Sequence, residues 1–590
     1  MAHIFESDTD SGSEFSGFGS SDIDVPLDHH DEPDSPVSSD ESDVDEPAHK
    51  AEWTQDFTPF VIDNFHGEPG PQLPDDFDTL TATPLEYFLL IFPVQLIQAL
   101  VAHTNAYSVW KIAQNGPDDH WEDVTFAEMR AFLGINILMG ISQLPHTEMY
   151  WSTNPFFDNA GVQRVMTCNQ FQKILQYFHA SDRSAEVGRG LPDYDKLYKV
   201  RSVMDVLLGT FRRYYTLSRE VAVDEAMVKY TGRLSFRQYM PAKPIKRGIK
   251  VWMLCDSANG YLAKLEVYLG RENNRTEHGL GHNVVTRLTS FLRNTFRWVF
   301  FDNVFIGLPL VQSLFQNGLY SCGTVRMNRK GFPPGLKKPR EVRERGDFKV
   351  MQQGDTNVTA SVWMDRKPVH HLSSLSDPED VRQCTRRSGP GILNLMQPHS
   401  VSMYNRFMGG VDLHDQLRAK YPVGRSSKKW WRHLFWFLLN SAIVNSFILF
   451  KTLSTRPTKK KRFTHLDFRM ELINELISGH CKRKRSTYEN RPPLVLAAEN
   501  VDKHRNVRRE MKKSTCKYHS HVLRQRRETQ GNVDDSYCYR SSHTDWYQVG
   551  HLLCAHGNVD SDRDLEYVWS MYWSDHDHDP DVHGHAGVSR

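Results

Sequence analysis

The spacing of hydrophobic residues predicts helices in the first part of the chain. Between Phe57 and about Leu191, apolar residues recur at the three-to-four residue period of amphipathic or buried helices. Thr83 stands before one such run, and Thr125 followed by Glu128 has the form of a capping box before another. Polar residues interrupt both runs before they reach the roughly twenty apolar residues of a bilayer span, so no membrane partner is expected.

The pattern changes to that of strands between Val221 and Gly270. Asp224 lies within an apolar run, a basic segment broken by two prolines follows it, and two runs of β-branched and aromatic residues then meet at Asn259-Gly260. An Asn-Gly pair between such runs is a strong signal for a β-hairpin. We therefore expect Asp224 on a strand, followed by a cationic loop and a hairpin.

Two further aspartates stand at the ends of predicted elements. Asp302 ends the short apolar run that begins at Arg297, and Asp412 follows a Gly-Gly turn at the start of a predicted helix, with Asp415 on the same helical face. Carboxylates fixed beside cations suit metal-assisted phosphodiester chemistry, because the metal must be positioned and the substrate charge neutralised. Any one of these aspartates could instead be a helix cap or a solvated end, so the prediction depends on the whole set.

Charge is unevenly distributed, although the formal net charge of the chain is zero. Residues 1–50 contain many carboxylates, a single lysine and few apolar side chains, so they are predicted to be disordered. The rest of the chain is correspondingly basic, which favours a nucleic-acid partner. The acidic tail could compete with DNA for the basic body or could simply be solvated chain. The scattered cysteines, with no secretory signal at the start, indicate a reducing, intracellular compartment.

Several phrases of the sequence together resemble the piggyBac family of DNA transposases and their domesticated descendants. In chain order they are VDEAMVKYTGRLSFRQYMPAKPIKRGIKVW, LCDSANGY, GLGHNVV, FDNVF, GTVRMNRKG, WMDRKPV, and YNRFMGGVDLHDQ followed by KKWWRHLFWFLLNSAIVNSF. Their order and spacing match the family from about Phe60 to Leu453, which is most of the chain.

The resemblance implies an α/β fold with an RNase H-like catalytic core and an insertion, joined to a mainly helical dimerisation and DNA-binding domain. It implies Mg²⁺ or Mn²⁺ as the cofactor, a homodimer, and double-stranded DNA as the partner. Carried over residue by residue, the catalytic and metal-binding triad is Asp224, Asp302 and Asp412, with Asp415 as a further candidate metal ligand. The predicted parts are a disordered acidic tail at 1–56, the helical domain at 57–216 and 426–480, the core at 217–330 and 401–425, the insertion at 331–400, and a basic linker with a degenerate Cys/His tail at 481–590.

Two groups of residues are predicted to contact DNA. The first lies in and around the loop after Asp224 and comprises Arg237, Lys243, Lys246, Arg247 and Lys250. The second comprises Lys428, Lys429, Trp430, Trp431 and Arg432. Lysines beside aromatic rings suit phosphate neutralisation and stacking on an exposed base. The charge runs could instead be solvated faces, and both tryptophans could instead belong to a hydrophobic core.

The end of the chain departs from the resembled family, whose members commonly finish with a Cys-rich zinc-binding domain. The remaining candidates for a zinc site are Cys516, His519, Cys538 and Cys554. Since no CxxC pair is present, we expect a degraded remnant rather than a folded Zn²⁺ site. The basic runs at 459–462 (KKKR) and 482–485 (KRKR) are of the nuclear-import type or are linker charges, and we favour a nuclear protein.

The sequence leaves two functions open. The first is an active cut-and-paste transposase that cleaves and joins DNA at TTAA sites, as the resemblance and the triad imply. The second is a domesticated nuclear DNA-binding protein that keeps the fold without transposition. The missing cysteine pairs favour the second, as do Ile306 and Gly307, which stand where the family usually has a polar pair.

Overall fold

The structure, a computed structural model, describes residues 52–241, 243–270, 279–354, 356–388, 391–453, 463–478 and 480. Residue contacts divide the chain into Met1–Lys484 and Arg485–Arg590, and every described residue belongs to the first unit. Residues 1–51 of the predicted acidic tail, the basic runs at 459–462 and 482–485, and the four candidate zinc residues therefore lie outside the described residues.

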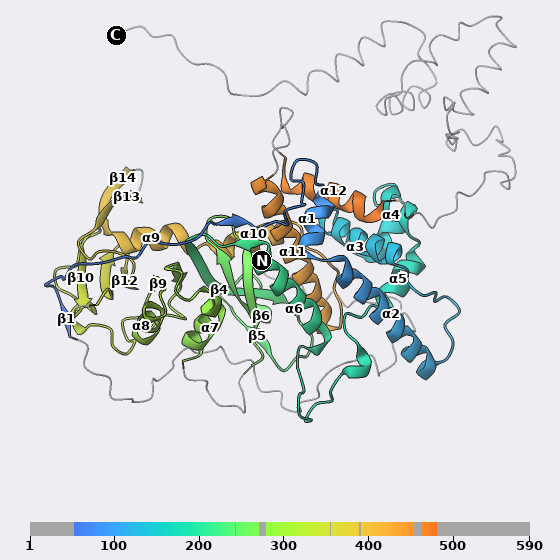
Figure 1. Ribbon diagram of the computed structural model, residues 1–590, viewed down its shortest axis with the longest axis horizontal. Coiled ribbons are helices and arrows are strands. Elements are labelled where there is room, and N and C mark those ends of the chain that lie inside the picture. The colour runs from blue at the N-terminus through green and yellow to red at the C-terminus, as the bar shows by residue number, and fades with distance from the viewer. Residues whose placement is uncertain are drawn as a thin grey trace, which may run out of the picture. The chain divides into compact units, whose positions relative to one another are not determined.

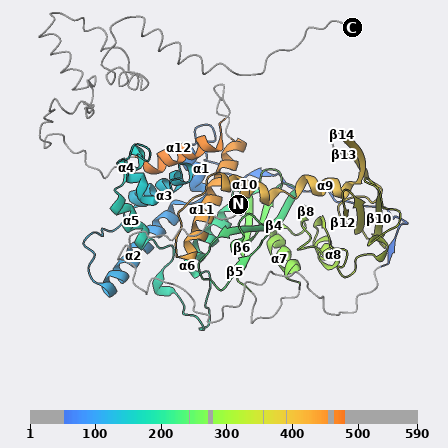
Figure 2. The ribbon, with the colours of Figure 1, turned by 180° about the vertical axis from the view of Figure 1, so that it is seen from behind.

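Helices precede the main sheet in the sequence and resume after it. The first set is α1 (Pro84–Ile91), α2 (Val94–Asn115), α3 (Phe126–Ile141), α4 (Ala160–Val165), α5 (Cys168–Tyr177) and α6 (Tyr198–Arg213), with the 3-10 turns η2 (Thr147–Trp151) and η3 (Arg183–Ala185). The second set is α11 (Trp430–Leu453) and α12 (His465–Ile477). Because α11 packs on α1 and α6 while α12 packs on α1 and α3, the two sets form one helical region (Figure 1, Figure 2).

Both predicted helix starts are confirmed, each with a capping box. The Thr83 hydroxyl accepts from the Glu86 N–H while the Glu86 carboxylate accepts from the Thr83 N–H, at the start of α1. Thr125 and Glu128 pair in the same way at the start of α3, and Thr464 begins α12 with a third box. Each box satisfies N–H groups that have no partner inside the helix, so local sequence fixes these boundaries.

The strands form one ten-stranded mixed sheet and two small two-stranded sheets. The large sheet contains β1 (Trp53–Thr54), β4 (Glu220–Lys229), β5 (Arg237–Tyr239), β6 (Arg247–Asp256), β7 (Leu262–Val267), β8 (Trp298–Phe301), β9 (Tyr320–Thr324), β10 (Phe348–Gln353), β11 (Thr359–Met364) and β12 (Pro368–Ser373). The small sheets pair β2 (Gly70–Pro71) with β3 (Tyr215–Thr216), and β13 (Val381–Ser388) with β14 (Gly391–Pro398).

Five neighbouring strands of the large sheet follow the order β7-β6-β4-β8-β9. The first three along the chain, β4, β6 and β7, are antiparallel, and the predicted hairpin at Asn259-Gly260 joins β6 to β7, with Gly260 at a φ of 78°. By contrast, β8 and β9 run parallel to β4 and are reached through α7 (Leu280–Thr289), the 3-10 turn η5 (Ser290–Leu292) and α8 (Leu308–Gln316). Parallel neighbours need such crossovers, which hairpins cannot provide.

The segment predicted as an insertion continues the same sheet. Beyond β9 the strand order is β12, β11, β10 and β1, all antiparallel, and the 3-10 turn η6 (Pro334–Leu336) precedes β10 in the chain. The strand β1 comes from the start of the described chain and pairs with β10, so segments distant in sequence share this edge (Figure 1). The large sheet therefore has a mixed half built from β4 to β9 and an antiparallel extension.

Two helices cover one face of the mixed half. They are α9 (His399–Phe407) and α10 (Gly410–Lys420), and α10 packs on β4 and β6 while α9 packs on β9 and β12. Phe300 and Cys322 of the sheet share a buried cluster with Tyr404 of α9. The predicted Gly-Gly turn before Asp412 is confirmed as the start of α10.

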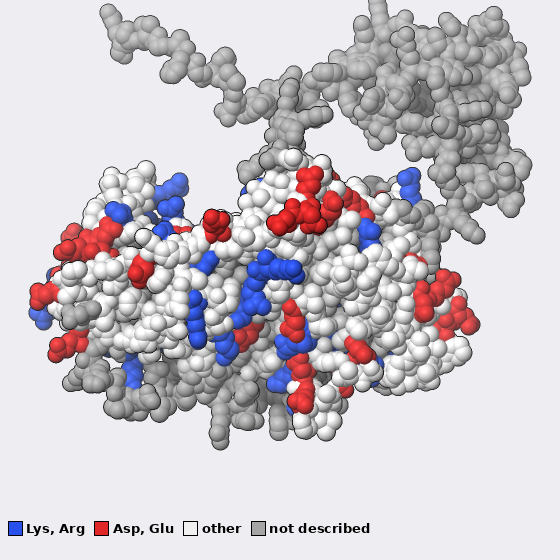
Figure 3. All heavy atoms as spheres, viewed as in Figure 1, with Lys and Arg blue, Asp and Glu red and all other residues white. Residues whose placement is uncertain are grey.

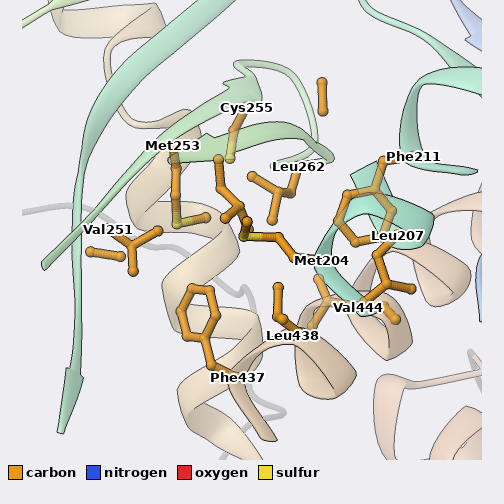
Figure 4. Packing of buried hydrophobic residues seen from close by; sticks show 14 of the residues in the cluster. Met204, Leu207, Phe211, Val251, Met253, Cys255, Leu262, Phe437, Leu438 and Val444 are labelled. Carbon is orange, nitrogen blue, oxygen red and sulfur yellow. The ribbon is translucent and has the colours of Figure 1, made fainter. Parts of the chain in front are cut away.

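The helical region and the sheet also share one core. Met204, Leu207 and Phe211 of α6, together with Leu438 of α11, pack toward Met253 and its neighbours on β6 (Figure 4). By length and composition alone, α11 could cross a membrane, but nine-tenths of its most apolar window is buried inside the protein (94%). A soluble core helix passes the same test, and the bent pair of α1 and α2 passes it only if both are counted as one span.

Candidate active site

Asp224 and Asp302 occupy adjoining positions on neighbouring strands. The parallel register of β4 and β8 pairs Ala222 with Phe300 and Val223 with Phe301, so Asp224 is the next residue on β4 and Asp302 directly follows β8. Neighbouring strands lie about 4.8 Å apart, and side chains two residues apart share a face of the sheet. Asp224 and Asp302 are therefore placed side by side, on the face covered by α9 and α10.

Gly410 allows α10 to approach this face closely. A Cβ added at Gly410 would lie 3.2 Å from the Ala222 Cβ and 3.0 Å from the Asp256 carbonyl oxygen. This contact holds the first turn of α10 against the strand that carries Asp224. Asp412 lies in that first turn and is exposed, where the positive end of the helix dipole favours a carboxylate.

Lys243 lies among these carboxylates. Its Nζ is 3.8 Å from Asp224 Oδ2 and 3.5 Å from Glu225 Oε1, and it donates a hydrogen bond of 3.1 Å to the Glu225 carbonyl oxygen. Burial lowers the pKa of Lys243, but the charges of Asp224, Glu225 and Asp412 raise it by more, and the pKa ends above its ordinary value. The side chain predicted to hold DNA phosphate is thus directed into the carboxylate cluster.

The pKa values of the two neighbouring carboxyl groups on β4 shift in opposite directions. Burial, reinforced by the Glu225 charge, raises the pKa of Asp224 to about 8, although Lys243 opposes the shift. Burial also raises the pKa of Glu225, but Lys250 and Lys243 lower it by more, so it lies below its ordinary value. Asp302 has a raised pKa, mainly because it is buried. Burial and the adjacent charge therefore make Asp224 the harder of the two carboxyl groups to ionise.

Sequence reasoning missed two members of this cluster. Glu225 directly follows Asp224, and its side chain is only 5% exposed. Tyr404 of α9 is also buried, and burial raises its pKa to about 12 with additional contributions from Asp302 and Asp224. An acidic pair in a buried strand was the available signal for Glu225. The signal for Tyr404 was weaker, because only its position in YNRFMGGVDLHDQ connects it with Asp412.

The side chains of the cluster are of a type that binds divalent metals, but their spacing is too wide for a metal site. Carboxylate oxygens are hard ligands of the kind that Mg²⁺ and Mn²⁺ prefer. Within the described part of the chain, however, no group of three or more His, Cys, Asp or Glu side chains is close enough to hold a metal ion. The three predicted aspartates meet around Lys243 without converging on one point, so the cluster fits a divalent ion in chemistry and would have to close to bind it.

Asp415 is engaged within its own helix. Its Oδ1 accepts a hydrogen bond of 2.9 Å from Arg418 Nη2, three residues further along α10. The preceding residue, His414, is buried, and its ring nitrogens contact the Gly260 carbonyl oxygen and the Ser441 hydroxyl. Asp415 also lies near enough to Cys255 for its charge to contribute to the raised pKa of that thiol. The structure thus gives Asp415 an ion pair of its own beside the cluster.

The other basic residues of the first predicted DNA-contacting group lie at the edge of the sheet. Lys246 and Arg247 are exposed, and the Arg247 guanidinium lies 4.8 Å from the centre of the Tyr239 ring. Arg237 Nη1 donates to two backbone carbonyls of the preceding loop, and Lys250 lies over the Trp252 ring. On the face shown in Figure 3, Lys and Arg side chains gather in the middle over the strands β4 to β6, with some Asp and Glu beside them.

The second predicted group divides between surface and core. Lys428 is exposed, and Lys429 Nζ lies 5.3 Å from the centre of the Tyr107 ring. The prediction that Trp430 and Trp431 are open for base stacking is wrong, because both rings are buried. Trp430 packs edge-on against Phe236, and Trp431 stacks near Phe178, as the helix they begin is enclosed by its neighbours.

Arg432 is likewise removed from the predicted DNA-contacting surface. It is buried, and its Nη2 donates to the carbonyl oxygens of Leu175, Gln176 and Phe178 at the end of α5. The last carbonyls of a helix have no partner inside the helix, so a buried guanidinium that reaches them has a structural role. The local charge pattern could not distinguish this role from DNA contact.

Comparisons with known proteins agree with the resemblance found in the sequence. A family model described as Transposase IS4 matches residues 83–447. Human (Homo sapiens) PiggyBac transposable element-derived protein 3 is 28% identical over 421 residues, which cover 69% of this chain and 67% of that protein. Human PiggyBac transposable element-derived protein 2 is 28% identical over 385 residues, and the match spans less than two thirds of its length, 62%.

A solved structure is also similar to this chain. It is the cryo-EM structure of a piggyBac transposase synaptic complex with hairpin DNA. The match has a TM-score of 0.60 and 27% sequence identity, and it covers 70% of this chain and 83% of the other. The residues matched by the family model include the three aspartates, and the chain belongs to the piggyBac transposase family.

Proposed function

We propose that this protein is a piggyBac-type DNA transposase that cleaves and rejoins DNA strands with a divalent metal, Mg²⁺ or Mn²⁺. In this proposal β4 to β9 form an RNase H-like core. Asp224, Asp302 and Asp412 hold the metal. The observation that carries the proposal is the β4–β8 register, which sets Asp224 beside Asp302 under the helix that carries Asp412.

The metal, when bound, would activate a water or 3′-hydroxyl and stabilise the leaving oxygen of the phosphodiester. The residues of the chain position the reacting groups. The sheet and α10 hold the carboxylates in place, while the exposed Lys246, Arg247 and Lys428 bind DNA phosphates and orient the strand. The similar transposase was solved with hairpin DNA, which supports double-stranded DNA as the substrate here.

The remaining features of the proposal follow from the family. They are cleavage and joining at TTAA sites, action as a homodimer through the helical region, and a nuclear location. Together they describe a cut-and-paste reaction on chromosomal DNA.

A specific observation supports the alternative, a domesticated nuclear DNA-binding protein without transposition. Gly307 is the N-cap of α8 and has no side chain to cap it, at the position where the family usually has a polar residue. This places a weakened helix start five residues after Asp302. In that case the basic surface would bind DNA while the carboxylate cluster stays inactive.

Strand cleavage distinguishes the two functions. Purified full-length protein is incubated with Mg²⁺ and a labelled duplex that carries candidate transposon ends flanked by TTAA. We expect the wild type to nick this duplex and Asp302→Asn to leave it intact. The variant should bind DNA with the affinity of the wild type, as measured by fluorescence anisotropy. DNA binding without nicking by the wild type, in either Mg²⁺ or Mn²⁺, would favour the domesticated protein.

A further inference from the structure

Lys243 contacts the carboxylate cluster more closely than the sequence suggested. Its ammonium lies within 4 Å of carboxylate oxygens from Asp224 and Glu225 and donates to the backbone carbonyl oxygen of Glu225. Its side chain is 28% exposed, against 12% for Asp224 and 5% for Glu225. An ammonium at this depth, shared by two buried carboxylates, acts as an internal counter-ion rather than as a surface charge.

The cluster retains acceptor capacity that Lys243 does not use. Glu225 Oε2 is buried and has no hydrogen-bond partner among the described residues. Asp302 adds a further carboxylate on the adjoining strand, and Lys250 acts on the cluster only as a nearby charge. Leaving a buried carboxylate oxygen unpaired is costly, so this oxygen marks a position that another cation or donor can fill.

The backbone around Lys243 is held while its side chain can move. The Lys243 N–H donates to the Met240 carbonyl oxygen at 3.2 Å, and the Met240 N–H donates to the Lys246 carbonyl oxygen at 2.8 Å. Pro241 and Pro244 flank the residue and restrict the turn further. A lysine side chain has four rotatable carbon bonds, so the ammonium can leave the cluster without a change in the loop.

A divalent ion and the Lys243 ammonium would compete for the same oxygens. Both are cations, and at a separation of a few ångströms in a partly buried site they repel each other strongly. A metal held by Asp224 and Asp302 would therefore have to displace the ammonium or bind more weakly beside it. This competition gives a physical reason why the carboxylates surround a lysine without converging on a metal position.

We propose that Lys243 is a resting counter-ion, which holds the Asp224–Glu225 carboxylates together in the metal-free protein and is displaced when a divalent ion binds. Glu225 is not one of the three predicted catalytic residues, and in this proposal it keeps the ammonium at the cluster. The inference rests on the proposed function, because it assigns a gate to the same metal site. Lys243 is here a positioning residue, and its role can be measured without DNA cleavage.

The test is the Mn²⁺ affinity of the full-length protein, measured by titration calorimetry in the absence of DNA. Lys243→Met removes the competing charge and keeps the length of the side chain, so it should tighten Mn²⁺ binding by about tenfold or more. Lys246→Met is the matched control, because Lys246 is exposed in the same loop, and it should bind Mn²⁺ as the wild type does. Asp302→Asn identifies the site, since it should weaken binding in either background.

A second measurement uses the wild type alone, in case Lys243→Met does not fold. An amine-reactive reagent followed by mass spectrometry reports how fast each lysine is acylated. We expect Mn²⁺ to speed the labelling of Lys243 several-fold, because the displaced ammonium becomes exposed, and to leave Lys246 unchanged.

The outcomes separate the inference from the proposed function. If Mn²⁺ binding depends on Asp302 but is equal in the wild type and Lys243→Met, the counter-ion role is wrong and the metal site stands. If Mn²⁺ binds and the labelling of Lys243 does not change, the same conclusion holds. If neither protein shows binding that depends on Asp302, both the counter-ion role and the proposed metal-dependent function are wrong.

Discussion

The helical region and the carboxylate cluster both bury charged side chains, but they neutralise them differently. In the helical region, Arg432 is surrounded by the carbonyl oxygens at the end of α5, and Arg469 on α12 donates to the side chains of Asn440 and His465. On the sheet, the carboxyl groups of Asp224 and Glu225 lie next to each other, and that of Asp302 directly follows the adjoining strand. One region supplies neutral acceptors to a cation, whereas the other gathers several acidic side chains around one lysine.

The two arrangements have different consequences for stability. A buried cation whose donors reach carbonyls is strongly destabilising to remove, since the carbonyls then lose their partner. Adjacent buried carboxylates repel each other, and removing one relieves the repulsion. Surplus charge of one sign therefore marks the sheet cluster as a binding site, while the arginines of the helical region hold helices together.

The largest expected effect is the loss of the structural arginine. Arg432→Met should lower the free energy of unfolding by about 3 kcal/mol, because three carbonyls at the end of α5 lose their donor. Urea denaturation followed by circular dichroism measures the change. The exposed neighbour Lys428, replaced by Met, should change the free energy of unfolding by less than about 0.5 kcal/mol. A loss below about 1 kcal/mol for Arg432→Met would remove the distinction between the two regions.

At the carboxylate cluster, removing a charged group is expected to raise the free energy of unfolding. The carboxyl of Asp224 titrates near 3.8 in the unfolded chain and at about 8 in the folded protein. The folded state therefore holds an extra proton between these values, and stability falls as the pH rises from about 4 to about 8. Asp224→Asn should remove this slope and stabilise the metal-free protein at pH 8 by more than about 1 kcal/mol.

The measurement is urea denaturation at several pH values in the presence of a chelator. Asp119→Asn is the matched control, because Asp119 is an exposed aspartate in the loop between α2 and α3, and it should leave the pH dependence unchanged. If Asp224→Asn instead lowers the free energy of unfolding, the Asp224 carboxylate has partners that stabilise it, as the buried arginines have.

The exposed lysines should affect DNA binding alone. Lys428→Ala and Lys246→Ala each remove a charge that can neutralise one phosphate, so the salt dependence of DNA affinity should weaken by about one unit of slope. At moderate salt each should bind DNA about fivefold more weakly, roughly 1 kcal/mol. Fluorescence anisotropy at a series of salt concentrations measures both quantities. The salt slope should be unchanged by Arg432→Met, provided that the variant is measured under conditions where it is folded.

The smallest expected effect concerns the uncapped start of α8. A Cβ at Gly307 would meet only Pro309 Cδ at 3.8 Å, which is ordinary contact, and its φ of −157° is extended. Gly307→Ser can therefore supply the missing N-cap hydroxyl and should raise the free energy of unfolding by a few tenths of a kcal/mol, roughly 0.3. If thermal unfolding instead shows a loss of stability, Gly307 is required for a reason other than space or capping.

Local sequence signals predicted the element boundaries near the site well. Thr83 and Thr125 begin helices with capping boxes, Asn259-Gly260 forms the predicted turn, and the runs before Asp302 and after Gly409 are a strand and a helix as expected. These features depend on hydrogen bonds and backbone preferences within a few residues of each other. Because the interacting residues are close together in the sequence, these features can be predicted without knowledge of the fold.

The sequence predicted only in part which residues far apart in the chain lie together in the fold. The resemblance brought Asp224, Asp302 and Asp412 together as a set, but the register that sets the first two side by side comes from strand pairing between segments far apart in the chain. Only the packing of β4 and α9 shows that Glu225 and Tyr404 belong to the cluster.

The sequence by itself determined the family, the helices with their caps, and the aspartates at the ends of their elements. Only the tertiary structure decided which charged and aromatic residues face inward. Trp431 and Arg432 follow two lysines in the sequence and look like a DNA-contacting run, yet the packing of α11 against α5 buries them. Lys243 looks like a phosphate contact, yet the fold turns it toward Asp224. Charge and residue type are local properties, whereas burial and partner depend on elements hundreds of residues away, and these decide what a charged side chain does.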